Sequence, residues 1–332
     1  MIKCSMCNNN SIYFNTICNK EYCQKHFSEY FEGSIKKNIQ QLTKKAPKLA
    51  VYYSGGKDSA VILYVLKKVL KYDVVAITAD LGLPQYFEKI ADLGNKICNE
   101  LGIKYYKAQL KHIIGVDIGE LIKEKNPRLA CHYCGEIRNI ALDRASRKLD
   151  VDAVVSGHNR DDITRFLLNN YLKNDIFRLM EFASKIYPRE DIVKMINYKN
   201  PIQLKPLIYL SEKEISLYCS IKNIELTTAC CGFGDKNKSD MQGWRNDLTY
   251  TINYLEQKYP GYSLDLINNF ENNLSTIFNE YIKSNPKVFK ERQCVFCKKS
   301  MNTEEKDVCL MCKNCAEEIG LKIDEQFSVT LI

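Results

Sequence analysis

A glycine-containing stretch, Ser54-Gly55-Gly56-Lys57-Asp58-Ser59, joins two apolar segments and constrains the fold more than any other part of the chain. The apolar run before it, residues 49–53, is typical of a buried parallel strand, and the apolar pattern over residues 60–70 is typical of a packed helix. Glycines allow a tight turn that brings backbone N–H groups close to an anion, and the helix N-terminus and Lys57 add positive charge. The stretch predicts a phosphate site between a strand and a helix, with a capped Gly-Gly turn that binds nothing as the alternative.

The spacing in this loop distinguishes it from the Walker loop, whose glycine positions are separated by four residues before Lys-Ser/Thr. It resembles instead the PP-loop of the adenylating ATP pyrophosphatases, in which Ser-Gly-Gly-x-Asp-Ser cradles the pyrophosphate that leaves as ATP is split to AMP. That resemblance implies that the loop binds ATP.

Strands and helices alternate after residue 49, which predicts an α/β fold built on a doubly wound parallel sheet. A helix is expected at 84–101, with Pro84 near its start and Gly102 as its C-terminal stop. Ligands of such sheets bind at the carboxyl ends of the strands, where the glycine loop lies. The expected strands are 49–53, 73–79, 103–108 and 152–156.

A second polar loop, Gly157-His158-Asn159-Arg160-Asp161-Asp162, follows the fourth expected strand at the same edge of the sheet. Asn159 or Asp161 as a cap of the next helix is the plain interpretation. A neutral histidine, an amide and two carboxylates beside a phosphate loop also suit Mg²⁺ and a nucleobase, and both roles can coexist. The expected ATP-binding residues are Tyr53, Ser54, Gly55, Gly56, Lys57, Asp58, Ser59, Ala79, Asp80, Gly157, His158 and Asn159.

The chain has fifteen cysteines, most of them in short-spaced clusters, which predicts metal sites rather than disulfides. Two ligand pairs near each end of the chain have the spacing of a tetrahedral zinc site. Cys18 and Cys309 are spare thiols beside these sites, and Cys98 and Cys219 are expected to be buried as small hydrophobic residues. The first zinc site is expected at Cys4, Cys7, Cys23 and His26, and the second at Cys294, Cys297, Cys312 and Cys315.

A third group of thiols lies between the two zinc motifs. Cys131 and Cys134 open a helix expected to run to about Leu149, and Cys230 and Cys231 follow nearly a hundred residues later. Three thiolates on an iron–sulfur cluster that normally takes four leave one iron open for chemistry. A redox pair that forms a persulfide and a third zinc site are the alternatives.

The net charge of +8 suits a polyanionic partner such as tRNA, although basic helix faces are often merely solvated. No stretch approaches ~18 uncharged apolar residues and the N-terminus has no signal-peptide core, so we expect a soluble, cytoplasmic protein without membrane contact. Residues 211–214 predict a capping-box helix start. Residues 236–290 look helical with a break at Pro260-Gly261, and their basic and aromatic side chains either contact RNA or form a solvated face.

Taken in order, these motifs resemble the archaeal, eukaryotic and thermophile tRNA 2-thiouridine synthetases, the family of TtuA and the cytoplasmic wobble-uridine thiolases. The resemblance covers most of the chain. It rests on Cys23-Gln24-Lys25-His26-Phe27, the glycine loop, Cys131-His132-Tyr133-Cys134-Gly135, Gly157 to Asp162, and Cys312-Lys313-Asn314-Cys315. The expected division is an N-terminal zinc finger (1–32), a linker helix (33–48), a PP-loop ATP pyrophosphatase domain (49–226), a helical RNA-facing segment (227–290) and a C-terminal zinc finger with tail (291–332).

The resemblance implies a homodimeric, ATP-dependent tRNA uridine 2-sulfurtransferase that adenylates the C2 oxygen of a uridine, releases pyrophosphate and replaces AMP with sulfur. It implies a 4Fe-4S cluster on Cys131, Cys134 and either Cys230 or Cys231, with Cys230 favoured because it follows a Thr-Thr-Ala stretch. The sulfur donor stays open among a ubiquitin-like thiocarboxylate protein, a persulfide and free sulfide, and so does the choice between the wobble and T-loop uridine.

Four residues are assigned to the chemistry. Lys57 cradles the leaving pyrophosphate, Asp58 lies near Mg²⁺, Asp161 acts on the base or the metal, and Arg138, one turn after the cysteine pair, matches a basic residue thought to assist catalysis in relatives. Three departures stand out: Arg160 where relatives usually have leucine, Ile163 where they often have an acid or a small residue, and Cys230-Cys231-Gly232 where they have cysteine followed by proline.

Other classes of protein fit the sequence less completely. A lysidine or amide-forming synthetase would keep the glycine loop without needing the central thiols. An ATP-independent desulfidase would leave the glycine loop without a task. A non-catalytic tRNA-binding zinc protein would bind RNA without ATP turnover.

Overall fold

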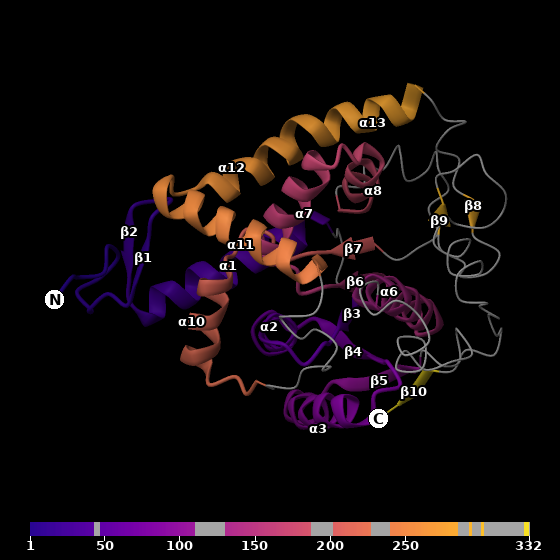
Figure 1. Ribbon diagram of the computed structural model, residues 1–332. Coiled ribbons are helices and arrows are strands. Elements are labelled where there is room, and N and C mark those ends of the chain that lie inside the picture. The colour runs from indigo at the N-terminus through magenta and orange to yellow at the C-terminus, as the bar shows by residue number, and fades with distance from the viewer. Residues whose placement is uncertain are drawn as a thin grey trace.

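The computed structural model describes residues 1–42, 47–109, 130–186, 202–226, 240–284, 292–293, 300–301 and 329–331 (Figure 1). Its centre is a six-stranded sheet in the order β10-β5-β4-β3-β6-β7. The five strands β5, β4, β3, β6 and β7 are parallel to one another, and β10 runs antiparallel to β5. The strands are β3 (Lys48–Tyr52), β4 (Asp73–Asp80), β5 (Lys104–Gln109), β6 (Ala153–Val155), β7 (Ile202–Leu204) and β10 (Val329–Leu331).

The expected α/β fold with a parallel sheet is confirmed, and the four expected strands correspond to β3, β4, β5 and β6. Strands β7 and β10 were not expected: each has three residues with a polar residue in the middle, whereas the equally short β6 lies in a continuous apolar run. Leu49, Ala50 and Val51 of β3 are completely buried, as expected for a central strand covered on both faces. The sheet therefore carries the glycine loop on one of its innermost strands.

Helix α2 (Lys57–Tyr64) begins directly after the glycine loop and continues as the π-helical turn η1 (Val65–Val69). Its apolar residues from Ala60 to Leu63 are buried, which explains the long apolar run in the sequence. The expected helix at 84–101 is α3 (Pro84–Leu101), and Gly102 ends it in the left-handed conformation, with φ of 64°. Glycine is required there because other residues adopt this conformation at a cost.

The N-terminal part is a short hairpin of β1 (Tyr13–Asn15) and β2 (Lys20–Tyr22), followed by α1 (Gln24–Leu42). The linker helix was expected from residue 33, whereas α1 begins nine residues earlier, at Gln24. The reason is an apolar stripe at four-residue spacing, which continues the helix and packs into the main core. Phe27, Phe31, Ile35 and Ile39 form this stripe and are completely buried.

Helix α1 packs on α10 (Glu212–Lys222) through matched side chains. Phe31 stacks on Tyr218 with ring centroids 4.2 Å apart. Glu32 accepts a hydrogen bond from the Tyr218 hydroxyl at 2.6 Å and pairs with Lys222 at 3.0 Å. The N-terminal part is therefore fixed to the helix that begins beside the glycine loop.

The remaining long helices form a layer beside the sheet, and Figure 1 shows α12 and α13 running across α7 and α8. A separate apolar core joins these helices, with Leu167, Leu179 and Phe270 at its centre. The helices of this layer are α7 (Arg160–Leu172), α8 (Ile176–Ile186), α11 (Asp240–Lys258), α12 (Tyr262–Asn269), the π-helical turn η3 (Phe270–Leu274) and α13 (Ser275–Ser284). Helix α6 (Ala130–Lys148) packs instead on β4 and β5.

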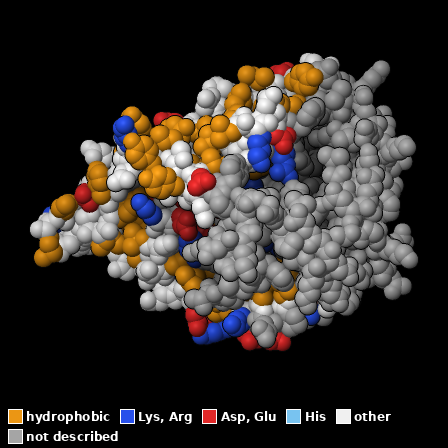
Figure 2. All heavy atoms as spheres, in the orientation of Figure 1, with side chains coloured by type: hydrophobic (Ala, Val, Ile, Leu, Met, Phe, Trp, Pro, Cys, Tyr) orange, Lys and Arg blue, Asp and Glu red, His pale blue; other side chains and the backbone are white. Residues whose placement is uncertain are grey.

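The expected break at Pro260-Gly261 separates α11 from α12. Gly261 has a φ of 99°, and Glu256 accepts hydrogen bonds from the N–H groups of Gly261 and Ser263, both at 2.9 Å. Apolar side chains gather on the visible face of this helical layer (Figure 2), and exposed tyrosines include Tyr250, Tyr254 and Tyr259. The ammonium of Lys258 lies 5.9 Å from the Tyr254 ring centre and 5.5 Å from that of Tyr259.

Two further observations complete the fold. A short antiparallel pair, β8 (Arg292–Gln293) and β9 (Ser300–Met301), brackets positions 294–299, which lie outside the described residues. Among the helices that the structure describes, none is both long and apolar enough to cross a membrane.

Candidate functional site

The glycine loop lies between β3 and α2 and turns through Gly55, which has a φ of 80°. The Ser59 hydroxyl folds the loop by donating to the Gly56 carbonyl at 2.9 Å and accepting from the Ser54 N–H at 3.2 Å. Gly56 is the N-cap of α2, and no side chain of the described chain caps the helix at this position. The first N–H groups of α2 thus face outward at the positive end of the helix dipole, which is the geometry of an anion site.

Lys57 and Asp58, the first two residues of α2, carry the charges of the loop. The Lys57 ammonium lies 2.7 Å from Glu212 Oε1 and 3.8 Å from Asp58 Oδ2. Burial acts to lower the pKa of Lys57, but the hydrogen bond to Glu212 and the charge of Asp58 outweigh it and raise the pKa, so Lys57 stays charged. Burial raises the pKa of Asp58 against the opposing effects of Lys57 and Asn159.

The loop after β6 meets the glycine loop because β6 pairs with β3 in the sheet. Asn159 is the N-cap of α7 and forms a reciprocal capping box with Asp162, so the plain interpretation of this residue is correct. Its side-chain N–H group also donates to Asp58 Oδ1 at 3.4 Å. One asparagine therefore both caps a helix and links the two loops.

Asp161 lies on the other side of this loop, against the start of α10. Its Oδ2 accepts a hydrogen bond from the Glu212 N–H at 2.6 Å, and burial raises its pKa. Asp161 thus holds the first residue of α10, whose side chain in turn holds Lys57.

His158 lies beside three cations. The Lys205 ammonium is 3.2 Å from His158 Nδ1 and donates to Ser156 Oγ at 3.1 Å. The charge of Lys205, followed by desolvation and the charges of Arg138 and Arg165, lowers the pKa of His158 well below its usual value, so the ring is neutral. Because an ammonium can only donate, Nδ1 acts as the acceptor and the proton lies on Nε2.

Gly157 lies where the two loops touch. A Cβ atom at this position would lie 3.1 Å from both Ser59 N and Asp58 Cβ, closer than such contacts normally are. The close approach of the two loops therefore requires glycine at this position.

Replacing Gly157 with alanine is expected to lower the free energy of unfolding by about 1–3 kcal/mol, because the backbone of α2 cannot rotate away from the added methyl group. Urea-induced unfolding measures this loss, and ATP binding is expected to weaken with it. Gly33→Ala is the matched control: nothing lies within 4 Å of the added Cβ, and alanine in a helix stabilises by up to about 1 kcal/mol. Equal effects of the two substitutions would contradict the prediction.

Three of the expected ATP-binding residues lie at the sheet edge with other side-chain roles. The Tyr53 ring is buried and meets Tyr105 edge-on at 5.8 Å, and the Tyr53 N–H donates to the Ile77 carbonyl at 2.8 Å, so neither group is available to a ligand. Asp80 accepts from the Gly82 N–H at 3.0 Å and pairs with Lys107 at 3.7 Å. Ala79 lies beside it near the end of β4.

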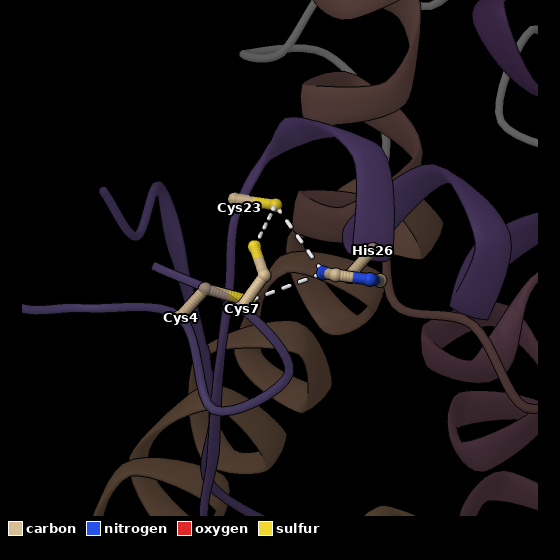
Figure 3. A group of neighbouring side chains, drawn as sticks. All are labelled: Cys4, Cys7, Cys23 and His26. Atoms are coloured by element: carbon tan, nitrogen blue, oxygen red, sulfur yellow. Dashed lines mark hydrogen bonds between the residues drawn. The ribbon is translucent and has the colours of Figure 1, made fainter. Parts of the chain in front are cut away.

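The four expected ligands of the first zinc site come together beside the N-terminal hairpin, with ligand atoms all within 4.8 Å of one another (Figure 3). Cys4 and Cys7 precede β1, Cys23 follows β2, and His26 lies in the first turn of α1. Cys7 Sγ is 3.7 Å from Cys23 Sγ, and His26 Nδ1 is 3.3 Å from Cys4 Sγ. Zinc–sulfur bonds of about 2.3 Å in a tetrahedron place two sulfurs roughly 3.8 Å apart, so the donor set fits zinc. The other ring nitrogen, His26 Nε2, lies 3.9 Å from Glu29, which is a usual outer partner of a metal-bound histidine.

Cys4 lies within the expected zinc site, whereas Cys18 lies outside it. Desolvation acts to raise the pKa of Cys4, but hydrogen bonds from the backbone of Cys23 and Met6 outweigh it and lower the pKa to about 6, which favours the thiolate that binds metal. The spare thiol, Cys18, is exposed and lies 3.6 Å from the Tyr22 hydroxyl instead.

The isolated cysteines, Cys98 and Cys219, are buried as expected. Burial raises the pKa of Cys98 to about 12 and is the main cause that raises the pKa of Cys219 to about 11, so both remain thiols. Cys131 and Cys134 lie in the first turn of α6. The other expected metal ligands lie outside the described residues. They are Cys230 with its alternative Cys231, and Cys294, Cys297, Cys312 and Cys315 with the spare Cys309.

Two residues of the site were not expected from the sequence. Glu212 was seen only as part of a capping box, and its contact with Lys57 spans 155 positions. Lys205 directly follows β7 at the carboxyl edge of the sheet, so recognition of that short strand would have found it.

Comparison with known proteins adds three findings. Residues 28–229 match the PP-loop domain family. The chain is 30% identical over 328 residues, 97% of each chain, to the tRNA-5-methyluridine(54) 2-sulfurtransferase of Pyrococcus horikoshii. It is 31% identical over 258 residues, 75% of this chain and 66% of the relative, to cytoplasmic tRNA 2-thiolation protein 1 of Meyerozyma guilliermondii.

Among solved structures, the fold is similar to that of the U34-tRNA thiolase NcsA from Methanococcus maripaludis with its [4Fe-4S] cluster. The TM-score is 0.78 and the identity 25%, over 98% of this chain and 99% of the other. The similarity therefore extends over nearly the whole chain, beyond the domain that contains the glycine loop.

Proposed function

The chain belongs to the PP-loop family and, within it, to the tRNA 2-thiolation proteins of the TtuA and cytoplasmic thiolase type, and on this premise we propose that it is an ATP-dependent tRNA uridine 2-sulfurtransferase. The observation that carries the proposal is the glycine loop at the carboxyl edge of the sheet, where the N-terminus of α2 lacks a side-chain cap and Lys57 and Asp58 face the Asn159 loop. A loop that served only as a turn would not need this charge arrangement.

In the proposed reaction, the C2 oxygen of a tRNA uridine attacks the α-phosphate of ATP, and the bond to pyrophosphate breaks. The N–H groups of α2 and the Lys57 ammonium stabilise the negative charge that develops on the leaving pyrophosphate. Asp58 is the residue placed to hold Mg²⁺ near the phosphates. Neutral His158 offers its Nε2–H group as a hydrogen-bond donor to the nucleotide or the base.

Sulfur then replaces AMP, and we propose that Cys131, Cys134 and Cys230 hold a 4Fe-4S cluster for this step. Helical spacing places positions 131, 134 and 138 on one face of α6, and the charge of Arg138 acts on His158. We propose that this face of α6 takes part in the site. The cluster would supply an open iron that carries sulfur, and Arg138 would steady the negative charge of the incoming group.

Further parts of the proposal concern metals and partners. Zinc bound by Cys4, Cys7, Cys23 and His26 would stabilise the N-terminal hairpin, and the C-terminal cysteines would hold a second zinc. We propose a cytoplasmic homodimer that takes sulfur from a thiocarboxylate protein, a persulfide or sulfide. The exposed tyrosines of α11 with Lys258 are suited to contact the tRNA.

The test is a thiolation assay with protein purified without oxygen, unmodified tRNA, ATP and sulfide. We expect one AMP per thiolated uridine, and nucleoside mass spectrometry of digested tRNA fragments identifies the position. About four irons and two zincs per chain are expected, with iron alone lost in Cys131→Ala. Thiolation by iron-free protein would mean that sulfide displaces AMP directly, which would contradict the proposed role of the cluster. Tight tRNA binding without AMP formation would contradict the proposed enzyme.

A further inference from the structure

The first turn of α10 reaches into the phosphate loop through one side chain, Glu212. Its Oε1 lies 2.7 Å from the Lys57 ammonium, whereas Asp58 lies 3.8 Å away. Lys57 is the one cation in the Ser54–Ser59 sequence, and 22% of its side chain is exposed. The Glu212 carboxylate therefore pairs with the Lys57 ammonium, which is the cation that a bound phosphate group would need.

The main chain of Glu212 is fixed by hydrogen bonds, whereas most of its side chain is exposed to solvent. The Glu212 N–H donates to Asp161 at 2.6 Å, and Ser211 and Glu214 close a capping box around the same turn. The side chain of Glu212, by contrast, is 60% exposed. Because solvent can hydrate the Glu212 carboxylate, this side chain can leave Lys57 at little cost, and an anion of higher charge competes with it for the ammonium.

We propose that Glu212 is a positioning residue that competes with pyrophosphate for Lys57, releasing the lysine when ATP binds and recapturing it as pyrophosphate leaves. Because the proposal rests on the proposed function, the ligand is the pyrophosphate moiety of ATP and of the product. A carboxylate and a phosphate beside one ammonium repel each other, so the two states exclude one another. No bond is formed or broken by Glu212, and its role is to limit how tightly the product is held.

The experiment is a calorimetric titration of magnesium pyrophosphate into the full-length protein. Glu212→Gln is expected to bind pyrophosphate roughly three- to fivefold more tightly, because the substitution removes the competing charge and retains the shape of the side chain. In steady-state thiolation, inhibition by added pyrophosphate should strengthen by a similar factor. A merely structural role of Glu212 predicts the opposite sign, since disturbing the loop weakens binding.

The matched control is Glu225→Gln, which removes the same charge from another exposed pair, that of Glu225 with Lys96, in which both side chains are 55% exposed. Its pyrophosphate affinity is expected to equal that of the wild type. The gain from Glu212→Gln should also vanish in a Lys57→Ala background, because the competed cation is then absent.

Unchanged or weaker binding by Glu212→Gln, in a protein whose circular dichroism matches the wild type, would overturn the proposal and leave the proposed function standing. A gain that persists without Lys57 would also overturn it. If the wild-type protein binds no pyrophosphate, the phosphate site itself fails and the proposed function fails with it.

Discussion

Replacing Lys57 with alanine is expected to lower the rate of AMP formation at saturating ATP and tRNA by roughly 10²- to 10³-fold, the usual effect of removing one group that stabilises transition-state charge. Lys57 is charged, partly buried and located in the first turn of α2, so its ammonium acts where solvent screens it little. Single-turnover formation of AMP, followed together with thiolated uridine in the same samples, measures the chemical step.

Lys68→Ala is the control for this variant, because Lys68 lies in the turn η1 that continues α2 and its side chain is exposed. This control is expected to react within about twofold of the wild type, since an exposed charge far from the loop contributes little. AMP formation by Lys57→Ala within tenfold of the wild-type rate would contradict the assigned role of Lys57 in holding the leaving pyrophosphate.

Part of the fold could be predicted because burial leaves a clear pattern in the sequence. Strands β3 and β4 are apolar on both faces, and α3 is bounded by Pro84 and Gly102, so both kinds of element could be located from local signals. The start of α1 differs from the expected residue 33 because the first turn of the helix overlaps the metal motif of Cys23 and His26. The apolar spacing that begins at Phe27 and continues to Ile39 starts inside this motif.

The candidate site was predictable where its residues are neighbours of glycines at strand ends, as with Lys57, Asp58 and Asn159. Contacts between distant segments left no such signal. Glu212 meets Lys57 across 155 positions, and Lys205 meets His158 across 47, and spacing alone carries no information about either pair. Their roles follow from the packing of α10 and β7 beside the loops.

Arg160 forms a buried ion pair with Glu214 that could not be predicted from the sequence. Arg160 is only 6% exposed, and its Nη2 lies 3.9 Å from Glu214, which is 1% exposed. Glu214 also accepts hydrogen bonds from the hydroxyls of Tyr13 at 2.9 Å and Tyr30 at 2.8 Å. Burial, followed by the charge of Glu214, raises the pKa of both tyrosines, so they remain donors. One carboxylate thus joins the N-terminal hairpin, α1, α7 and α10.

Glu214→Ala is expected to lower the free energy of unfolding by about 3–5 kcal/mol, because it leaves Arg160 as an unpaired buried charge and removes the acceptor of two tyrosine hydroxyls. Urea-induced unfolding at constant zinc concentration measures the loss. The control, Glu280→Ala, alters an exposed pair with Lys283 at 3.4 Å and is expected to change the stability by less than about 1 kcal/mol.

A double variant separates the charge from the hydrogen bonds. Adding Arg160→Leu to Glu214→Ala removes the unpaired charge and inserts an apolar side chain at a buried position, so the double variant is expected to recover about 1–3 kcal/mol of the loss. The remaining loss reports the tyrosine hydroxyls together with the capping box of α10, because Glu214 also accepts hydrogen bonds from the N–H and hydroxyl groups of Ser211. If the double variant were no more stable than Glu214→Ala, the buried arginine would not depend on Glu214 for its charge balance, and the link between the N-terminal hairpin and α7 would rest on packing alone.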